Sequence, residues 1–297
     1  MNKSYNLPVY LRIIMISLVL VISFLSILLG FPIAKLMGID PSDFMGSNFQ
    51  PTVKTLTVIV AFAATQFLLI WMVIRLIHKK PLKGLGFKGP ILFPLLIGTG
   101  IGILWQAFGY LLIHVTGGAI SIALSIPKEV SVITMIAYLL LNVLFLLTLN
   151  SLKEELVYRT YPIEQFNDHP QLMIPVIVIV SLVFAAVHHI LLPFQIDDFI
   201  YRFTVALVLS FVYYRWRSIW LISGLHNGLN LLNNLTSGNY KMGGLTDLTI
   251  ANDPSKGMSI IIDVAVAIIF IIIFNYIWNK EKRNNKMFFK IRHPLSE

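Results

Sequence analysis

The sequence contains no cysteine and few charged residues. The first absence excludes disulfide bonds, thiolate nucleophiles and metal sites built on cysteine. The second argues against an ordinary soluble domain, because only 12% of the 297 residues are charged, whereas soluble domains carry about 25%. In their place, 57% of the residues are hydrophobic and the mean hydropathy is +0.79. This balance is typical of a protein with several membrane-spanning segments.

Acidic residues are the scarcer of the charged ones, which leaves a formal net charge of +9. A basic excess is common in nucleic-acid-binding proteins, but here Lys and Arg gather in loops and in the tail beside apolar runs. At such places they orient a chain in the bilayer. We therefore expect the lipid bilayer, and no nucleic acid, as the partner of this charge. Within the tail, basic residues alternate with Met287 and Phe288, so anionic-lipid binding is an alternative to a plain topology anchor.

Eight apolar stretches are long enough to cross a membrane, which takes roughly 20 helical residues. The first is too long for a signal peptide and lacks a convincing cleavage site, so we interpret it as an uncleaved span. No polar connection exceeds about twenty residues, which leaves no room for a soluble domain. The predicted fold class is all-α, a polytopic integral membrane bundle of about eight transmembrane helices. The spans cover residues 10–37, 52–77, 90–115, 130–150, 172–189, 199–214, 219–235 and 258–278.

We expect one continuous membrane domain with three parts. About three helices lie in 1–128, a core with ionisable residues lies in 129–236, and the last helix and basic tail lie in 237–297. With eight spans, the basic connections fall on the same side as both termini, and the positive-inside rule makes that side the cytoplasm. The abundance of Ile, Asn and Lys indicates an AT-rich genome and favours a bacterial cell membrane. No motif specifies an oligomeric state.

Ionisable side chains inside apolar spans cost about 2.5–3.5 kcal/mol each on insertion scales, so they usually mark cavities and functional sites. Three polar groups of this kind occur. One holds Glu154, Glu155 and Arg159, and the second ends the fifth span with His188 and His189. The third lies inside the seventh span and comprises His226, Asn227, Asn230, Asn233 and Asn234.

Helix geometry sorts these side chains. Glu155 and Arg159 are four residues apart, so they share a helix face and can pair, while Glu154 points about 100° away. His226 and Asn230 are also four apart and share a face. Each pair also has a plain structural interpretation, as an ion pair within one helix or as hydrogen-bonding residues between helices.

The three groups can meet only if the fourth helix extends beyond its apolar run. We predict that it continues past Glu154, kinks at Pro162 and turns at residues 167–170. Glu154 then lies about 20 Å from the turn, close to the depth of His188 on the next span. The sequence therefore predicts a polar cavity between helices, wetted from the cytoplasmic side.

Three motifs occur in order: EExxxR from Glu154, FxxxH from Phe184 to His188, and HxxxN from His226 to Asn230. Each motif alone is weak. All three, in this order and on membrane helices, resemble the CAAX-protease and bacteriocin-processing (Abi) family of membrane endopeptidases, which are Rce1-like. The resemblance covers about eighty residues and does not extend to the first three spans or the last.

The resemblance implies an all-helical intramembrane bundle that hydrolyses a peptide bond of a membrane-associated peptide or protein without a cofactor. A carboxylate in a poorly solvated cavity is chemically suited to act as a general base for this reaction. The residues implied are Glu154 and His188 as activators of a water, His226 and Asn230 as the oxyanion hole, and Glu155 with Arg159 as a supporting pair.

Three alternatives remain open. A zinc protease would use Glu154, His188 and His226 as ligands, although no HExxH motif is present. A non-catalytic scaffold or bacteriocin-immunity-type protein of the same fold would bind a membrane peptide without cutting it. A proton-coupled transporter would relay protons through these side chains, although paired half-repeats with interrupted helices are not recognisable.

Overall fold

The computed structural model describes residues 7–26, 30–38, 53–78, 82–124, 131–141, 148–190, 193–236, 246–251 and 255–283. Most of these residues are helical, as the all-α prediction requires. The α-helices are α1 (Val9–Ser26), α2 (Gly30–Leu36), α4 (Val53–His78), α5 (Leu92–Val115), α6 (Val132–Leu141), α7 (Thr148–Glu155), α8 (Tyr161–Gln165), α9 (Met173–Val187), α10 (Ile196–Trp216), α11 (Ile219–Leu235) and α12 (Lys256–Arg283). Shorter elements are the 3₁₀ helices η2 (Leu82–Leu85) and η5 (Pro170–Leu172) and the π-helical turn η4 (Leu156–Thr160).

Four of the described helices are long and apolar enough to cross a membrane: α1, α5, the stretch Pro170–Val187 that contains α9, and α12. Helix α4 contains a shorter apolar run, Val60–Leu76. Large apolar side chains such as Leu104 on α5 and Ile272 on α12 are exposed, as lipid-facing residues are in spanning helices. These features indicate an integral membrane bundle, and the count of eight spans stays a prediction.

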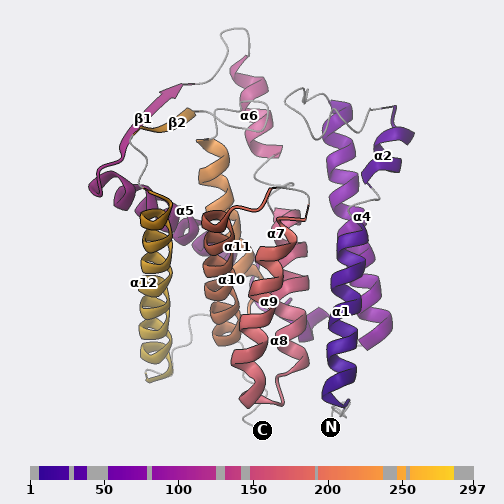
Figure 1. The fold of residues 1–297 in the computed structure, drawn as a ribbon. Coiled ribbons are helices and arrows are strands. Elements are labelled where there is room, and N and C mark those ends of the chain that lie inside the picture. The colour runs from indigo at the N-terminus through magenta and orange to yellow at the C-terminus, as the bar shows by residue number, and fades with distance from the viewer. Residues whose placement is uncertain are drawn as a thin grey trace.

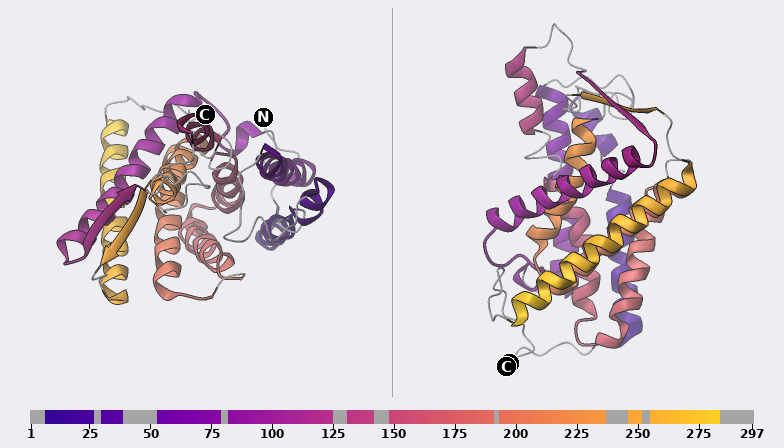
Figure 2. Two further views of the ribbon diagram at one scale, coloured as in Figure 1. Left: turned by 90° about the horizontal axis from the view of Figure 1, so that it is seen from above. Right: turned by 90° about the vertical axis from the view of Figure 1, so that its left-hand side faces the viewer.

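The helices stand side by side in one bundle, with α1 and α4 at one edge and α12 at the other (Figure 1). Helix α11 lies in the interior, packed against α5, α7 and α10. Seen from above, α9 and α10 lie between the two edges together with α11 (Figure 2). The polar residues of α7 and α11 are therefore placed inside the bundle.

Glycines bring α5 and α11 into backbone contact. A Cβ atom at Gly98 or Gly102 of α5 would collide with the backbone of α11, and one at Gly224 or Gly228 of α11 would collide with that of α5. Both pairs have the GxxxG spacing that lets membrane helices approach closely. His226 stands between the two glycines of α11, so this contact fixes its position relative to α5.

Helix α1 is fastened to the turn that follows α8. The Arg12 guanidinium donates a hydrogen bond to the carbonyl oxygen of Gln165 and forms an ion pair with the Asp168 carboxylate. These hydrogen bonds from Arg12 hold the pKa of the Asp168 carboxyl below its usual range. The turn itself lies at residues 166–168, where the sequence predicts the chain to reverse.

The structure differs from the predicted spans in the first stretch. Residues 10–37, predicted as a single span, contain α1, which ends at Ser26, and a separate helix that begins at Gly30. Pro32 stands in the first turn of this second helix, where a proline is tolerated because its missing N–H has no partner there. The helix packs on α4 next to Val58.

A small antiparallel sheet was not predicted. Strand β1 (Ala119–Leu124) pairs with β2 (Thr246–Ala251), and Ala119 lies opposite Ala251. The sheet joins the chain after α5 to the chain before α12, at the end of the bundle where α12 begins (Figure 1). The class is therefore all-α apart from this one pairing of strands.

Candidate active site

The helix that carries the paired glutamates contains a π-helical turn. Helix α7 ends at Glu155, and η4 follows over Leu156–Thr160. The N–H of Tyr161 donates to the carbonyl of Leu156, five residues earlier. Pro162 explains this register, because it has no N–H for the carbonyl four residues before it and its ring would press on that carbonyl. The predicted kink is thus an inserted π turn, a feature that recurs at functional sites.

Glu155 and Arg159 form a buried ion pair at the π turn. Their side chains are 0% and 1% exposed, and Arg159 Nη1 lies 3.2 Å from Glu155 Oε1. The guanidinium also lies over the ring of Phe184 on α9, 3.9 Å from the ring centroid, a favourable cation–π position. Among the described side chains, Glu155 Oε2 and both Nη atoms of Arg159 have no hydrogen-bond partner. This pair is therefore held by charge and stacking more than by hydrogen bonds.

His226 lies between the two glutamates. Its Nδ1 is 2.8 Å from Glu155 Oε1, and its Nε2 is 3.7 Å from Glu154 Oε2. The first distance is a hydrogen bond, whereas the second is too long for one. Since a carboxylate only accepts, Nδ1 carries the hydrogen in the contact with Glu155. Glu155 thereby orients the imidazole so that Nε2 faces Glu154.

Glu154 is fixed by a residue of its own helix. Asn150 Nδ2 donates to Glu154 Oε1 at 2.8 Å, while the other oxygen faces His226. The residue before Glu154, Lys153, donates a hydrogen bond from Nζ to Gln66 Oε1 of α4 at 3.0 Å. The sequence analysis did not select Asn150, although its spacing of four residues before Glu154 was a readable signal.

His188 closes α9 next to the same group of residues. Its Nδ1 lies 2.7 Å from the carbonyl oxygen of Phe184, and its ring contacts the Phe184 ring at 4.6 Å between centroids. The Phe184 ring also lies 6.3 Å from that of His226. No ion pair joins His188 to Glu154 among the described side chains, but the two are near enough for their charges to interact.

The neighbouring His189 points elsewhere. Its Nε2 lies 3.5 Å from the Asp198 carboxylate of α10, and its ring packs against Phe194 and Phe199. Of the two adjacent histidines, only His188 is placed next to Phe184 and the glutamates. The FxxxH spacing favours the same histidine.

Asn230 lies one turn beyond His226 on α11 and is half-buried. It forms no hydrogen bond with any residue in the described part of the chain, so its amide is able to donate. Asn233, a further turn along, is fixed in orientation, because its Oδ1 accepts a hydrogen bond from Tyr110 of α5 at 3.0 Å.

The structure thus brings Glu154, Glu155, Arg159, His188 and His226 together around Phe184, with Asn230 next to His226 on one helix face. Across the described residues, no group of three or more His, Asp and Glu side chains is arranged to hold a metal ion. The cavity that the sequence predicts at this place, and the roles of its residues, stay predictions.

Sequence comparisons bear on this same segment. The model of the family described as type II CAAX prenyl endopeptidase Rce1-like matches residues 136–232, roughly a third of the 297-residue chain. No curated protein and no solved structure was found to match. The matched stretch contains all three motifs and every side chain of the group just described. Over this segment, the chain is similar to the Rce1-like family of CAAX prenyl endopeptidases, the resemblance that its motifs predict.

Proposed function

We propose that this protein is an intramembrane endopeptidase that hydrolyses a peptide bond of a membrane-associated peptide or protein. The observation that carries the proposal is the position of His226, hydrogen-bonded to one carboxylate and facing a second. An imidazole in such a position is suited to proton transfer and to charge stabilisation. The family match supplies the reaction class, because it is a family of endopeptidases.

Glu154 is the proposed general base. Asn150 engages one of its oxygens, and the other is directed toward His226 without a direct hydrogen bond. Glu154 takes a proton from a water as the water oxygen attacks the carbonyl carbon. It returns that proton to the amine nitrogen when the C–N bond breaks. No metal is needed for this sequence of proton transfers.

His188 is proposed to position the same water. Its Nδ1 is engaged by the carbonyl oxygen of Phe184, so this nitrogen carries the hydrogen and Nε2 is left with a lone pair. A lone pair near Glu154 accepts a hydrogen bond from the water that the carboxylate deprotonates. The two side chains then hold the nucleophile from two directions.

His226 and Asn230 are proposed to stabilise the oxyanion. The unengaged amide of Asn230 provides one donor. His226 provides a second donor at Nε2 when its imidazole carries a hydrogen on both nitrogens. The carboxylates of Glu154 and Glu155 beside the ring balance the positive charge of this form. Loss of one such donor typically lowers kcat by about 10²–10³.

The proposed substrates are membrane-associated peptides, such as pheromone precursors, bacteriocin leaders or membrane-protein fragments, rather than prenylated proteins. This proposal assumes a bacterial cell membrane with both termini of the chain in the cytoplasm. It is supported by the apolar spans and by the basic connections that follow α4 and α12.

The proposal is tested by comparing wild type, Glu154→Gln and Asp247→Asn in membranes of the native cell. Peptides and small membrane proteins are profiled by mass spectrometry with and without a chelator. Asp247→Asn is the matched control, because it makes the same carboxylate-to-amide change on the exposed strand β2. We expect fragments in wild type and control that fall by about 10²–10⁴ in Glu154→Gln, the range that a general base contributes.

Three other outcomes have definite meanings. Fragments that disappear with chelator would assign the water activation to a metal. Fragments that survive in Glu154→Gln would remove the role of this carboxylate. Identical profiles in all variants, together with a phenotype on deletion of the protein, would replace catalysis by the scaffold function.

A further inference from the structure

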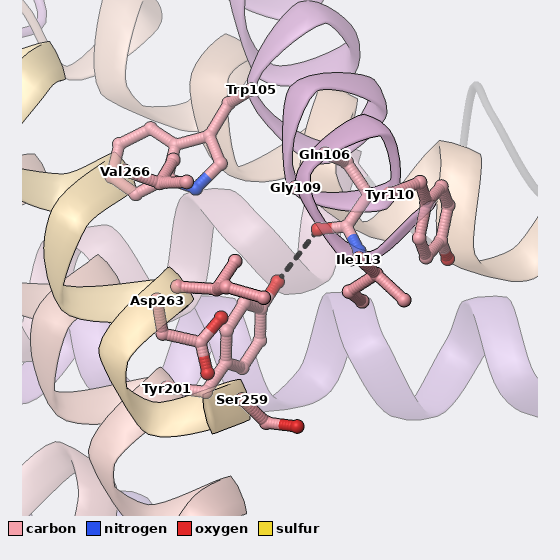
Figure 3. A pocket seen from close by; sticks show the side chains of 10 residues that line it. Trp105, Gln106, Gly109, Tyr110, Ile113, Tyr201, Ser259, Asp263 and Val266 are labelled. Atoms are coloured by element: carbon pink, nitrogen blue, oxygen red, sulfur yellow. Dashed lines mark hydrogen bonds between the residues drawn. The ribbon is translucent and has the colours of Figure 1, made fainter. Parts of the chain in front are cut away.

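A pocket lies between α5, α10 and α12, outside the group around His226. Its volume is about 130 Å³, far more than one water needs. Figure 3 shows that Gln106 and Tyr110 come from α5, Tyr201 from α10 and Asp263 from α12. The remaining lining residues named in the figure include Trp105, Ser259 and Val266.

Asp263 is the one carboxylate among the residues that line this pocket. It stands on a helix long and apolar enough to span a membrane, where an ionised side chain is costly and usually functional. It makes no hydrogen bond or ion pair with any residue that the structure describes. By contrast, two other polar side chains of the pocket are bonded to each other, since Tyr201 donates to Gln106 at 3.0 Å (Figure 3).

The surroundings of Asp263 add negative charge and aromatic surface. Asp197, at the start of α10, is close enough to act electrostatically on Asp263. Lys256 Nζ lies 3.9 Å from the Asp197 carboxylate, but the lysine side chain is 70% exposed, so solvent screens its charge. Trp105 and Tyr201 present rings to the same pocket, and aromatic rings beside a carboxylate are suited to an ammonium or guanidinium group.

The pocket is connected to the proposed catalytic residues through α11. Tyr110, which lines it, donates to Asn233 at 3.0 Å. Asn233 follows His226 by seven residues, so both lie on nearly the same helix face, about 10 Å apart along the axis. An extended peptide rises about 3.3 Å per residue. A chain held at His226 therefore reaches this pocket within about three to five residues.

We propose that this pocket is a subsite for a positively charged side chain of the substrate peptide, a lysine or arginine about three to five residues from the scissile bond. The inference rests on the proposed endopeptidase function. Asp263 binds the cation, and Trp105 and Tyr201 cover its flanks. A peptide occupant is favoured over a lipid amine because Tyr110 of the pocket wall is hydrogen-bonded to Asn233, which lies on nearly the same face of α11 as His226.

The test measures binding separately from cleavage. Short apolar fluorescent peptides carry one lysine, or norleucine of similar length, at successive positions. Their affinity is measured by anisotropy for the full chain in phosphatidylglycerol nanodiscs, in a Glu154→Gln background that prevents turnover. We expect lysine to bind about tenfold tighter than norleucine at one position, the factor that a hydrogen bond to a charged group provides. Asp263→Asn abolishes this preference, Asp263→Glu retains it, and Asp247→Asn leaves it unchanged.

The outcomes separate this subsite from the function it rests on. A lysine preference that depends on Asp263, in a protein that cleaves no peptide, would support the subsite and contradict the proposed endopeptidase function. Cleavage without any lysine preference would uphold the protease and overturn the subsite, and this comparison of peptides needs no variant. If phosphatidylethanolamine is retained by wild type but not by Asp263→Asn in native mass spectrometry, and lysine gives no preference, the pocket binds a lipid amine and the peptide proposal is wrong.

Discussion

Among the described residues, two glutamate–arginine pairs are built differently, although their glutamates are only nine residues apart in the sequence. At Glu164, Oε1 accepts hydrogen bonds from Tyr213 Oη and Arg217 Nη1, each at 2.9 Å. Arg217 also donates to Asn167 at 2.9 Å. Every group in this network has a partner, and together they hold Arg217 in a left-handed backbone conformation with φ of 49°, which by itself costs about 1–2 kcal/mol.

The pair at Glu155 lacks that completeness. Arg159 lies 3.2 Å from Glu155, yet its two Nη atoms find no hydrogen-bond acceptor among the described residues. Glu155 Oε1 instead accepts a hydrogen bond from His226 Nδ1. A buried polar network that is fully satisfied stabilises one arrangement, whereas an incompletely satisfied one recurs where a protein performs chemistry. The first pair therefore fixes one arrangement of its side chains, whereas in the second Glu155 Oε1 is also used to orient His226.

The largest expected effect that tests this difference is on turnover. His226→Ala should lower cleavage of an identified substrate by about 10³-fold, because it removes the oxyanion donor proposed above. Thermal unfolding should show that the variant still folds. His189→Ala is the control, since this ring faces Asp198 and not the glutamates. Equal losses in the two variants would mean that the activity assay reports folding.

The next effect is on stability. Glu155→Ala should reduce the free energy of unfolding by about 3–5 kcal/mol, because it leaves Arg159 buried without its counter-ion. Glu164→Gln should cost less, about 1.5–3 kcal/mol for hydrogen bonds to a charged group, and should leave turnover per folded molecule unchanged. Both are read from denaturant unfolding in detergent. A Glu155→Ala protein as stable as wild type would contradict the predicted contribution of this ion pair to the free energy of unfolding.

A smaller effect should come from the glycine contact that places His226. A methyl group at Gly102 would press against the backbone of α11, so Gly102→Ala should cost about 1–3 kcal/mol as overpacking and lower activity by shifting the imidazole. Gly100 lies in the same helix and faces open space, so Gly100→Ala should be neutral or slightly stabilising. Thermal shift and turnover are compared for the pair of variants. Identical behaviour would mean that α5 and α11 do not pack through this face.

The smallest effect is pH dependence at the turn after α8. Arg12 lowers the pKa of Asp168 in the folded protein, so the ion pair contributes stability above the ordinary carboxyl pKa. That contribution is lost as pH falls through the lowered value. The Asp168 side chain is 43% exposed, so solvent limits the effect to less than about 1 kcal/mol. Melting curves at acidic pH should converge for wild type and Asp168→Asn; a constant gap between them would exclude this ion pair as the cause.

Several elements of the structure were predictable because they depend on neighbours along the chain. The spacing of four residues between Glu155 and Arg159 predicts their ion pair. Asn and Pro predict a turn at 167–170, and the structure has a turn at 166–168. The order of the three motifs predicts the family, which the match over residues 136–232 confirms. The kink was predicted at Pro162, but its form as a π turn was not.

Contacts between distant segments were not predictable from one sequence. Glu155 was predicted to pair only with Arg159. It also accepts a hydrogen bond from Nδ1 of His226, which lies 71 residues away in the sequence. The GxxxG pairs of α5 and α11 are readable as spacing, but the sequence does not say which two helices they join. Two other contacts between distant segments were equally unpredictable. They are the pairing of β1 with β2 and the hydrogen bond from Tyr110, which lines the Asp263 pocket, to Asn233.

By itself, then, the sequence determines that this is a helical membrane protein with a segment similar to the Rce1-like family and with polar residues at defined positions along its spans. Hydrophobic length and helical periodicity are local properties, which explains why they can be read in order. The tertiary structure decides which carboxylate orients His226, which of two adjacent histidines lies beside it, and which asparagine is bonded to Tyr110. Those choices depend on how closely α5, α9 and α11 approach α7, and packing between helices is settled only when the chain is folded.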